Sequence, residues 1–258
     1  MWLDGALVDP REASLSIDDP GVRHGVGLFE TMRVQDGVVP WLDRHLERLA
    51  RSSAALALDG VPHTGQVREA VALVAAALGA GAARIRVTVT PHPTLLVDGS
   101  PTDTDPHETL AAISIRGAWH PANRIAEHKT LSYLAWRDAE RQAHAVGADT
   151  ALLLDADGRL GEAATANVFC VVGGEIITAP ISGILPGITR GIVMDLAPVR
   201  EAVLDEPTWR GADEIFVTSA VRGAVPLARI DGRELGGENG VTTTLRRRVD
   251  ALLWPVRE

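Results

Sequence analysis

The chain has 258 residues, of which 46% are hydrophobic and 4% aromatic, and its formal net charge is −9. This composition is typical of a globular protein with a sizeable core, in one large domain or two smaller ones. Its arginines are scattered apart from the run at 246–248, so we expect no basic face for a nucleic acid. We see no secretory signal and no apolar run near the roughly 20 residues that span a membrane, and we expect a cytoplasmic protein.

The first half of the chain alternates short strands and two helices. Two Asp-Gly pairs lie between apolar residues and accept the positive φ angles of tight turns, which predicts hairpin strands at WLDGALVD and VQDGVVP. The apolar stripe of DRHLERLARSSAALAL predicts a helix that Asp43 would cap, and a second helix is expected at 64–79. Strands follow at ARIRVTVT and AAISIRGAW, and the polar segment 91–107 between them is expected to be a mobile loop.

The second half mixes strands and helices without a regular alternation. The expected elements are the helix SYLAWRDAERQAHAVG, the hairpin TALLLDADGRL, the strands ANVFCVVGG, EIITAP and EIFVTSA, a helix that opens at LPGITRG, and a helix at the C-terminus. This pattern predicts an α+β or irregular α/β fold. We expect two domains, at 1–118 and 129–258, joined by a linker at 119–128.

Lys129 is the only lysine in the sequence, although lysine and arginine together number 25. A surface lysine is interchangeable with arginine, and every other basic position except the histidines is arginine. Arginine stays protonated and cannot condense with a carbonyl group, whereas a lysine amine can form a Schiff base. The single lysine is therefore a candidate catalytic group.

Three further features strengthen this interpretation. LPGITRG places a Pro-Gly turn before a helix whose first amides, at Ile188 and Thr189, would be free to bind phosphate. In RHLERL, His45 and Arg48 share one helical face, and Arg48 has the donor geometry to clamp a phosphate. Glu162 follows a predicted hairpin, where its carboxylate could face a cleft. Each feature taken alone is more often an ordinary helix start or a surface charge.

Other functional motifs are excluded. HGVGLFE lacks the third glycine and the βαβ context of a dinucleotide site. His24, His120 and His128 do not have metal-ligand spacing, so no metal is expected, and no Gly-x-Ser-x-Gly motif of serine hydrolases occurs. Cys170 lies in the apolar run NVFCVV and is expected to be a buried hydrophobic residue.

The combined set resembles the fold-type IV pyridoxal phosphate enzymes, which include branched-chain and D-amino acid aminotransferases and aminodeoxychorismate lyase. The resemblance implies a two-domain fold like that of D-amino acid aminotransferase, a pyridoxal 5'-phosphate cofactor and a homodimer. The motifs that carry it, from residue 25 to 232, are GLFETMRV, DGVVPWLDRHLERL, HKTLSYL, GEAATANVFCV, ILPGITRG and EIFVTSAVRGAVPLARIDG.

The resemblance also implies roles for individual residues. Lys129 would be the Schiff-base lysine and proton shuttle, and Glu162 would partner the protonated pyridine nitrogen, which makes the ring an electron sink. The phosphate ligands would be Arg48, Ile188, Thr189 and Ser219, with Ala220 at the place where the aminotransferases usually have a phosphate-binding threonine.

Two positions favour the lyase within this family. Ala220 resembles the lyase, and Thr31 occupies a position where the lyases carry a threonine linked to pyruvate elimination. A further departure, Ser132 before Tyr133, is expected to alter hydrogen bonding only. The expected activity is therefore conversion of 4-amino-4-deoxychorismate to 4-aminobenzoate and pyruvate, as in folate biosynthesis, with Arg33 and Arg86 as candidate ligands of the substrate carboxylates.

Two alternatives remain open. One is an aminotransferase for branched-chain, D-amino acid or related amine substrates, which would use the same Lys129. The other is a non-catalytic pyridoxal phosphate-binding protein, which would hold the cofactor without turnover. In all three cases the partner is a small molecule.

Overall fold

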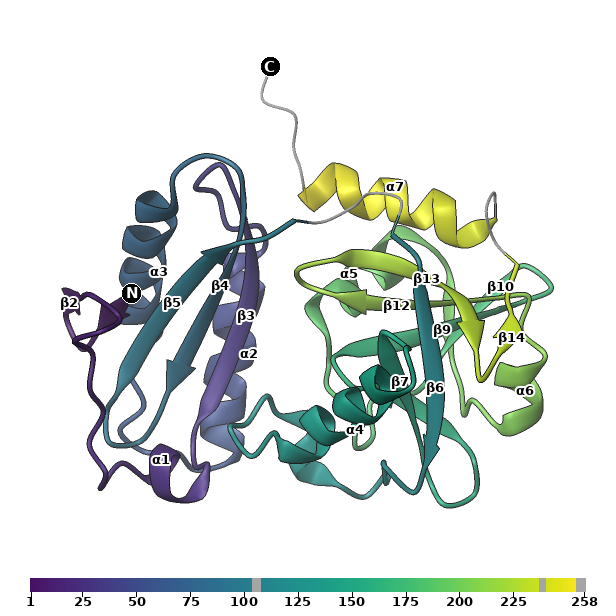
Figure 1. Ribbon diagram of the computed structural model, residues 1–258, viewed down its shortest axis with the longest axis horizontal. Coiled ribbons are helices and arrows are strands. Elements are labelled where there is room, and N and C mark those ends of the chain that lie inside the picture. Colours follow the sequence, from purple (N-terminus) through teal and green to yellow (C-terminus); the bar gives the residue numbers. More distant parts are fainter. Residues whose placement is uncertain (104–107, 237–239, 254–258) are drawn as a thin grey trace. The chain divides into compact units, whose positions relative to one another are not determined.

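The computed structural model describes residues 1–103, 108–236 and 240–253, and the chain forms two compact units, each with its own sheet and core (Figure 1). The first unit comprises Met1–Thr104 and His128–Tyr133, and the second comprises Asp105–Glu127 and Leu134–Glu258. Helices and strands are mixed in both units, which confirms the predicted α+β class.

This division differs from the expected linker at 119–128. The segment around Lys129 returns to the first unit, because Phe29 donates its amide to the Lys129 carbonyl at 2.8 Å and Leu131 donates to the Gly27 carbonyl at 3.0 Å. Strand β6 (Leu110–Arg116), which the sequence pattern places in the first domain, pairs instead with β7 (Thr150–Leu154) and β13 (Gly223–Ile230) of the second unit. Strand partners are long-range contacts, so a composition change along the chain does not reveal them.

In the first unit, a sheet of order β2-β1-β5-β4-β3 carries two helices on one face. All of its strand pairs are antiparallel. The apolar stripes of α2 and α3 bury Leu46, Leu49, Val67 and Val71 against the sheet. The elements of this unit are β1 (Trp2–Leu3), β2 (Ala6–Leu7), α1 (Pro20–His24), β3 (Leu28–Gln35), α2 (Leu42–Ala55), α3 (Thr64–Leu78), β4 (Ala82–Val89) and β5 (Leu95–Pro101).

Both Asp-Gly turns form as predicted. Asp4 and Gly5 have φ angles of 45° and 112°, and Asp36 and Gly37 have φ angles of 50° and 77°. The first turn joins β1 to β2, whereas the second is followed only by the bridge between Gln35 and Val38.

Two local predictions in this unit were wrong. Trp41, with φ of 55°, is the cap residue of α2, and Asp43 lies inside its first turn, where it contacts Arg68 on α3. The expected loop at 91–107 contains strand β5, which pairs with β4 along its whole length. The Pro, Thr and Asp residues of that segment hid the alternation at Leu95 and Val97, both of which are buried. Residues 104–107 of the predicted loop lie outside the described residues.

In the second unit, strands β6, β7, β8, β9, β12 and β13 close on themselves, because β8 pairs with both β7 and β9. Strands β10 and β11 extend the sheet beyond β9. The elements not yet placed are the 3-10 helix η1 (Arg124–Glu127), α4 (Leu134–Ala145), β7 (Thr150–Leu154), β8 (Leu160–Ala163), β9 (Ala166–Val172), β10 (Glu175–Thr178), α5 (Ile188–Leu196), β11 (Val199–Glu201), α6 (Glu206–Arg210), β12 (Glu214–Ser219), β13 (Gly223–Ile230), β14 (Arg233–Glu234) and α7 (Val241–Leu253).

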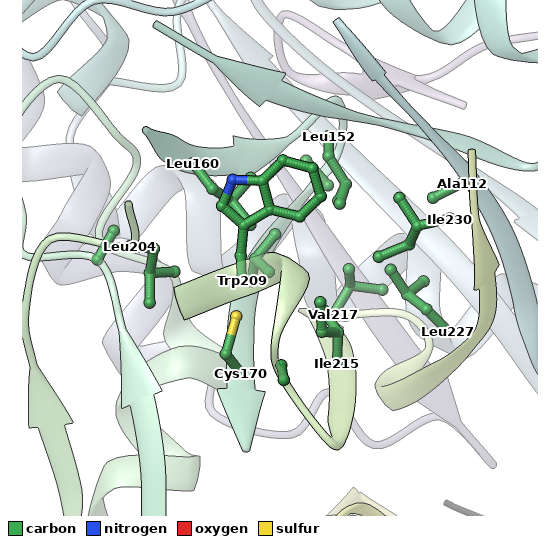
Figure 2. Packing of buried hydrophobic residues seen from close by; sticks show 14 of the residues in the cluster. Ala112, Leu152, Leu160, Cys170, Leu204, Trp209, Ile215, Val217, Leu227 and Ile230 are labelled. Atoms are coloured by element: carbon green, nitrogen blue, oxygen red, sulfur yellow. The ribbon is translucent and has the colours of Figure 1, made fainter. Parts of the chain in front are cut away.

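The main core of this unit lies around Trp209 of α6, which packs among Leu152, Leu160, Cys170 and other strand residues (Figure 2). Trp209 is 1% exposed, and its indole N–H donates to the Gly158 carbonyl at 3.1 Å. A buried indole removes a large apolar area from water while its polar group stays paired. This side chain therefore fixes α6 against the strands of the second unit.

The alternate residues of β9 and β12 point to the other face of the sheet. There Phe169 and Phe216 stack with ring centroids 4.8 Å apart, and the Glu214 carboxylate accepts hydrogen bonds from the Val241 and Thr242 amides at 2.9 Å. Glu214 thus holds the N-terminus of α7 on this face. Within the described residues, no helix has the length and hydropathy needed to cross a lipid bilayer.

Candidate active site

A buried charge cluster links β3 to α2 in the first unit. Glu30 accepts two hydrogen bonds from Arg48, Nε to Oε1 at 2.8 Å and Nη2 to Oε2 at 2.6 Å, and its Oε2 lies 2.7 Å from Nδ1 of His45. All three side chains are at most 4% exposed. The spacing of His45 and Arg48 on one helical face, which the sequence predicted, allows both to reach one carboxylate.

The protonation states in this cluster follow from burial and charge. Burial alone would raise the pKa of Glu30, but the Arg48 charge and the hydrogen bonds from His45 and Arg48 outweigh it and lower the pKa to about 2. Burial also lowers the pKa of His45, against the opposing effect of Glu30, so the imidazole is neutral. Glu30 therefore carries a full negative charge, and Arg48 is held rigidly by two bonds.

Lys129 lies beside the aromatic ring of Phe29, which is on β3 next to Glu30. Its Nζ is 4.3 Å from the Phe29 ring centroid and 5.5 Å from that of Tyr133, and the Arg86 guanidinium carbon is 3.8 Å from the Phe29 centroid. Tyr133 meets Phe29 edge to face at 5.1 Å. An amine and a guanidinium thus share one buried ring, and each gains a cation–π contact.

The other residues predicted to contact the substrate lie on the sheet face that carries Phe29. Thr31 on β3 is directly opposite Arg86 on β4, and Arg33 is directly opposite Arg84. Phe29, Thr31 and Arg33 alternate along β3 and so point to one side. The structure therefore brings Thr31, Arg86 and Lys129 around Phe29, and it places Arg33 further along the strand, 2% exposed, with Nη2 3.5 Å from Gln35.

In the second unit, Glu162 of β8 is 4% exposed. Its Oε1 accepts the indole N–H of Trp136 at 3.1 Å, and its Oε2 accepts the Leu185 amide at 3.2 Å. Glu162 is thus a buried carboxylate that interacts with N–H donors, and it is not a surface charge.

A polar row crosses three strands at this point. Glu162 on β8 is opposite Asn167 on β9, and Asn167 is opposite Thr218 on β12. Asn167 also donates to the Leu185 carbonyl at 2.8 Å, and a Cβ atom at Gly187 would lie 2.0 Å from its Oδ1. Asn167 therefore packs tightly against the turn that opens α5, and only glycine fits at position 187.

The N-terminus of α5 has the features of an anion site. Gly187 is its N-cap and provides no side-chain bond, so the first amides, including those of Ile188 and Thr189, have no capping oxygen from this residue. The hydroxyl groups of Thr189 and Thr218 are buried and have no hydrogen-bond partner within the described residues. Buried hydroxyls without a partner are costly, and a phosphate would satisfy them.

Ser219 and Ala220 follow Thr218 at the end of β12 and are half-buried. The Ser219 hydroxyl accepts the Arg222 amide at 3.3 Å, which organises the turn into β13. Among the described residues no cluster of three or more His, Cys, Asp or Glu side chains could hold a metal ion. Burial raises the pKa of the Cys170 thiol to about 12, so this residue is no nucleophile.

Comparison with known proteins identifies the family. The sequence profile of the amino-transferase class IV family matches residues 27–230. The chain belongs to this family. It is 31% identical to a Methanocaldococcus jannaschii protein named "Putative branched-chain-amino-acid aminotransferase", over 92% of this chain and 90% of that protein. It is 26% identical to aminodeoxychorismate lyase of Bacillus subtilis, over 95% of this chain and 91% of the lyase.

Class IV aminotransferases use pyridoxal phosphate. A hypothetical aminotransferase from Mycobacterium tuberculosis in its pyridoxal phosphate-bound form superposes with a TM-score of 0.88 at 25% identity, covering 98% of each chain. The residues of this class IV chain fit that cofactor: Lys129 supplies an amine, Glu162 a buried carboxylate, and Thr189 of α5 and Thr218 of β12 supply unsatisfied hydroxyls. The expected cofactor is thereby confirmed, and the individual residue roles remain predictions.

Four residues described above, one in the first unit and three in the second, were not among the predicted site residues: Glu30, Trp136, Asn167 and Thr218. Glu30 and Asn167 had a visible signal, because each is a polar residue inside an apolar strand, LFETMRV and ANVFCVV respectively. Trp136 and Thr218 had none, since an aromatic residue in a helix and a threonine in a strand are ordinary core residues.

Proposed function

We propose that this class IV enzyme is an aminotransferase that acts on an amino acid. The observation that carries the proposal is the pairing of Arg86 and Lys129 on the Phe29 ring, each within 4.3 Å of its centroid. A substrate with a carboxylate next to its amine can pair with the guanidinium, while its amine would take the place of the Lys129 amine on the cofactor. The 31% identical relative, whose name denotes a branched-chain aminotransferase, supports this choice over the lyase that we first expected.

The proposed residue roles are those that the family resemblance implies, and the burial and contacts of each side chain within its own unit support them. When bound, pyridoxal phosphate supplies an electron sink for the pair released at the substrate carbon. In the proposed mechanism, Lys129 Nζ removes the proton from the carbon that bears the amino group and later returns a proton. Glu162 would accept the pyridine N–H, and the phosphate ligands would be Arg48, the amides at Ile188 and Thr189, and the Thr189 hydroxyl.

Arg86 has the role of orienting the substrate. Its guanidinium is held against Phe29, so it presents donors in a fixed plane that suits a carboxylate. Thr31 is directly opposite Arg86 on the neighbouring strand and would line the same part of the substrate site. Arg33 is too deeply buried to be our first choice as a carboxylate ligand.

The test is amino-group transfer by the purified, cofactor-loaded protein. L-leucine, L-alanine and D-alanine are each offered as donors with 2-oxoglutarate as acceptor, and glutamate and the new oxo acid are measured. We expect equal amounts of both products from at least one donor, and none from Lys129→Ala. The preferred hand of the donor is read from the same experiment. Absence of transfer from all donors by a protein that holds the cofactor on Lys129 would refute the aminotransferase proposal.

Aminodeoxychorismate lyase remains the second candidate because of Thr31, which lies on the Phe29 face of β3 where a hydroxyl can reach a leaving group. It is tested with 4-amino-4-deoxychorismate, from which a lyase releases 4-aminobenzoate and pyruvate. Thr31→Gly would abolish most of that release, whereas it would leave amino-group transfer largely intact. If neither reaction occurs while the cofactor is bound, the chain is a pyridoxal phosphate-binding protein without turnover.

A further inference from the structure

A hydrogen bond joins the indole of Trp136 on α4 to the Glu162 carboxylate on β8. Trp136 Nε1 lies 3.1 Å from Glu162 Oε1, while the Leu185 amide lies 3.2 Å from Oε2. One N–H group on each oxygen defines the plane of the carboxylate. Since Glu162 is 4% exposed, water cannot readily replace either donor.

Packing holds the indole in this position. Trp136, Ala139 and Ala143 are spaced three and four residues apart, so they lie on one face of α4. Ala139 and Ala143 are buried against Ala151 and Leu153 of β7, and Trp136 packs on the same cluster. Leu153 is the residue directly opposite Glu162 on the neighbouring strand. The helix face that covers β7 therefore also carries the indole N–H to the carboxylate.

The type of donor has an electrostatic consequence. Glu30, which is equally buried, is bonded by the Arg48 guanidinium, and that cation offsets its charge. The indole N–H is a neutral donor, so it orients the Glu162 carboxylate and stabilises the anion without adding a positive charge beside it. A carboxylate oriented by this donor can pair with a protonated pyridine nitrogen.

We propose that Trp136 is a positioning residue, which fixes the Glu162 carboxylate so that it keeps the pyridine nitrogen of the cofactor protonated. The proposal rests on the cofactor role assigned to Glu162 above. Removal of the indole N–H takes away one hydrogen bond to a charged acceptor, and we expect the protonated form of the pyridine to be disfavoured about tenfold.

The experiment compares Trp136→Phe with wild-type protein and Trp119→Phe, each loaded with pyridoxal phosphate labelled with nitrogen-15 in the ring and free of substrate. Trp119 is a matched control, because its indole donates to the Gly183 carbonyl at 2.7 Å and its ring packs on Gly161, next to Glu162. The ring nitrogen shift is followed as a function of pH. We expect its titration midpoint in Trp136→Phe to fall by about one pH unit, and to stay unchanged in Trp119→Phe.

An unchanged midpoint in Trp136→Phe would overturn the proposal, and failure of wild-type protein to bind the cofactor would instead overturn the role of Glu162. Should Trp136→Phe not fold, the indole N–H signals of Glu162→Gln test the hydrogen bond on which the proposal depends. We expect the Trp136 signal to move when its carboxylate acceptor becomes an amide, while the Trp119 signal stays in place. A stationary Trp136 signal would contradict the hydrogen bond itself.

Discussion

The Glu30 cluster gives the most quantitative prediction for stability. Glu30→Gln leaves the Arg48 guanidinium, 4% exposed, without its counter-charge. Breaking a buried ion pair from one side typically costs about 3–5 kcal/mol. The lowering of the Glu30 pKa from 4.5 to about 2 gives an independent figure of about 3 kcal/mol, at about 1.4 kcal/mol for each pH unit. The two estimates agree, so we expect a loss of about 3 kcal/mol in the free energy of unfolding.

The contribution of Glu30 to the free energy of unfolding depends on pH with a definite sign. Because the pKa of Glu30 is lowered in the folded protein, its contribution is complete above pH 4.5 and is lost as the pH falls from 4.5 towards 2. Urea unfolding at neutral pH and across this acid range measures both effects. Glu47→Gln is the control, since Glu47 lies on the same helix but is exposed. If Glu30→Gln unfolds at the same urea concentration as Glu47→Gln, and with the same acid dependence, the reasoning fails.

Three other substitutions test the core and the phosphate end of the site. Trp209→Ala removes the indole at the centre of the second unit and should cost about 3–5 kcal/mol, as measured by urea unfolding. Gly187→Ala places a methyl group 2.0 Å from Asn167 Oδ1, so we expect α5 to shift and the dissociation constant for pyridoxal phosphate to rise more than tenfold, as measured by equilibrium dialysis. Thr218→Val keeps the shape of a buried side chain whose hydroxyl has no partner among the described residues. It should weaken cofactor binding severalfold without lowering thermal stability, and unchanged binding would show that the hydroxyl does not contact the cofactor.

Local patterns in the sequence predicted much of the fold because they reflect local physics. The Asp-Gly turns at residues 4 and 36 need only the conformational freedom of two residues, and both formed. The helix that opens at LPGITRG was predicted from its Pro-Gly turn, and α5 begins at Ile188. Strand β5 was missed because Asp98, Gly99, Ser100 and Pro101 have loop-like propensities, which pairing with β4 overrides.

Contacts between residues far apart in the sequence limit how much of the candidate site can be predicted. Glu162, Thr189 and Lys129 were predicted from their chemical types, and their burial and contacts suit those roles. The partner of Arg48 was not predicted: two bonds to Glu30, 18 residues earlier in the sequence, orient this guanidinium. A sequence shows that a carboxylate and a guanidinium exist, but a strand must pair and a helix must pack before they meet. Positioning residues such as Trp136 therefore become visible only in the folded chain.

The single lysine yields a further prediction. Several arginines use the guanidinium fork on one carboxylate, as Arg200 does with Glu175 and Arg48 with Glu30, a geometry that lysine cannot reproduce. Lys129 contacts aromatic rings, where either cation would serve. Lys129→Arg should therefore change stability by less than about 1 kcal/mol, yet carry no cofactor after borohydride reduction, because a guanidinium does not condense with an aldehyde. Intact mass measures the adduct and urea unfolding measures the stability; an adduct on the variant, beyond that on the terminal amine, would contradict the covalent role of Lys129.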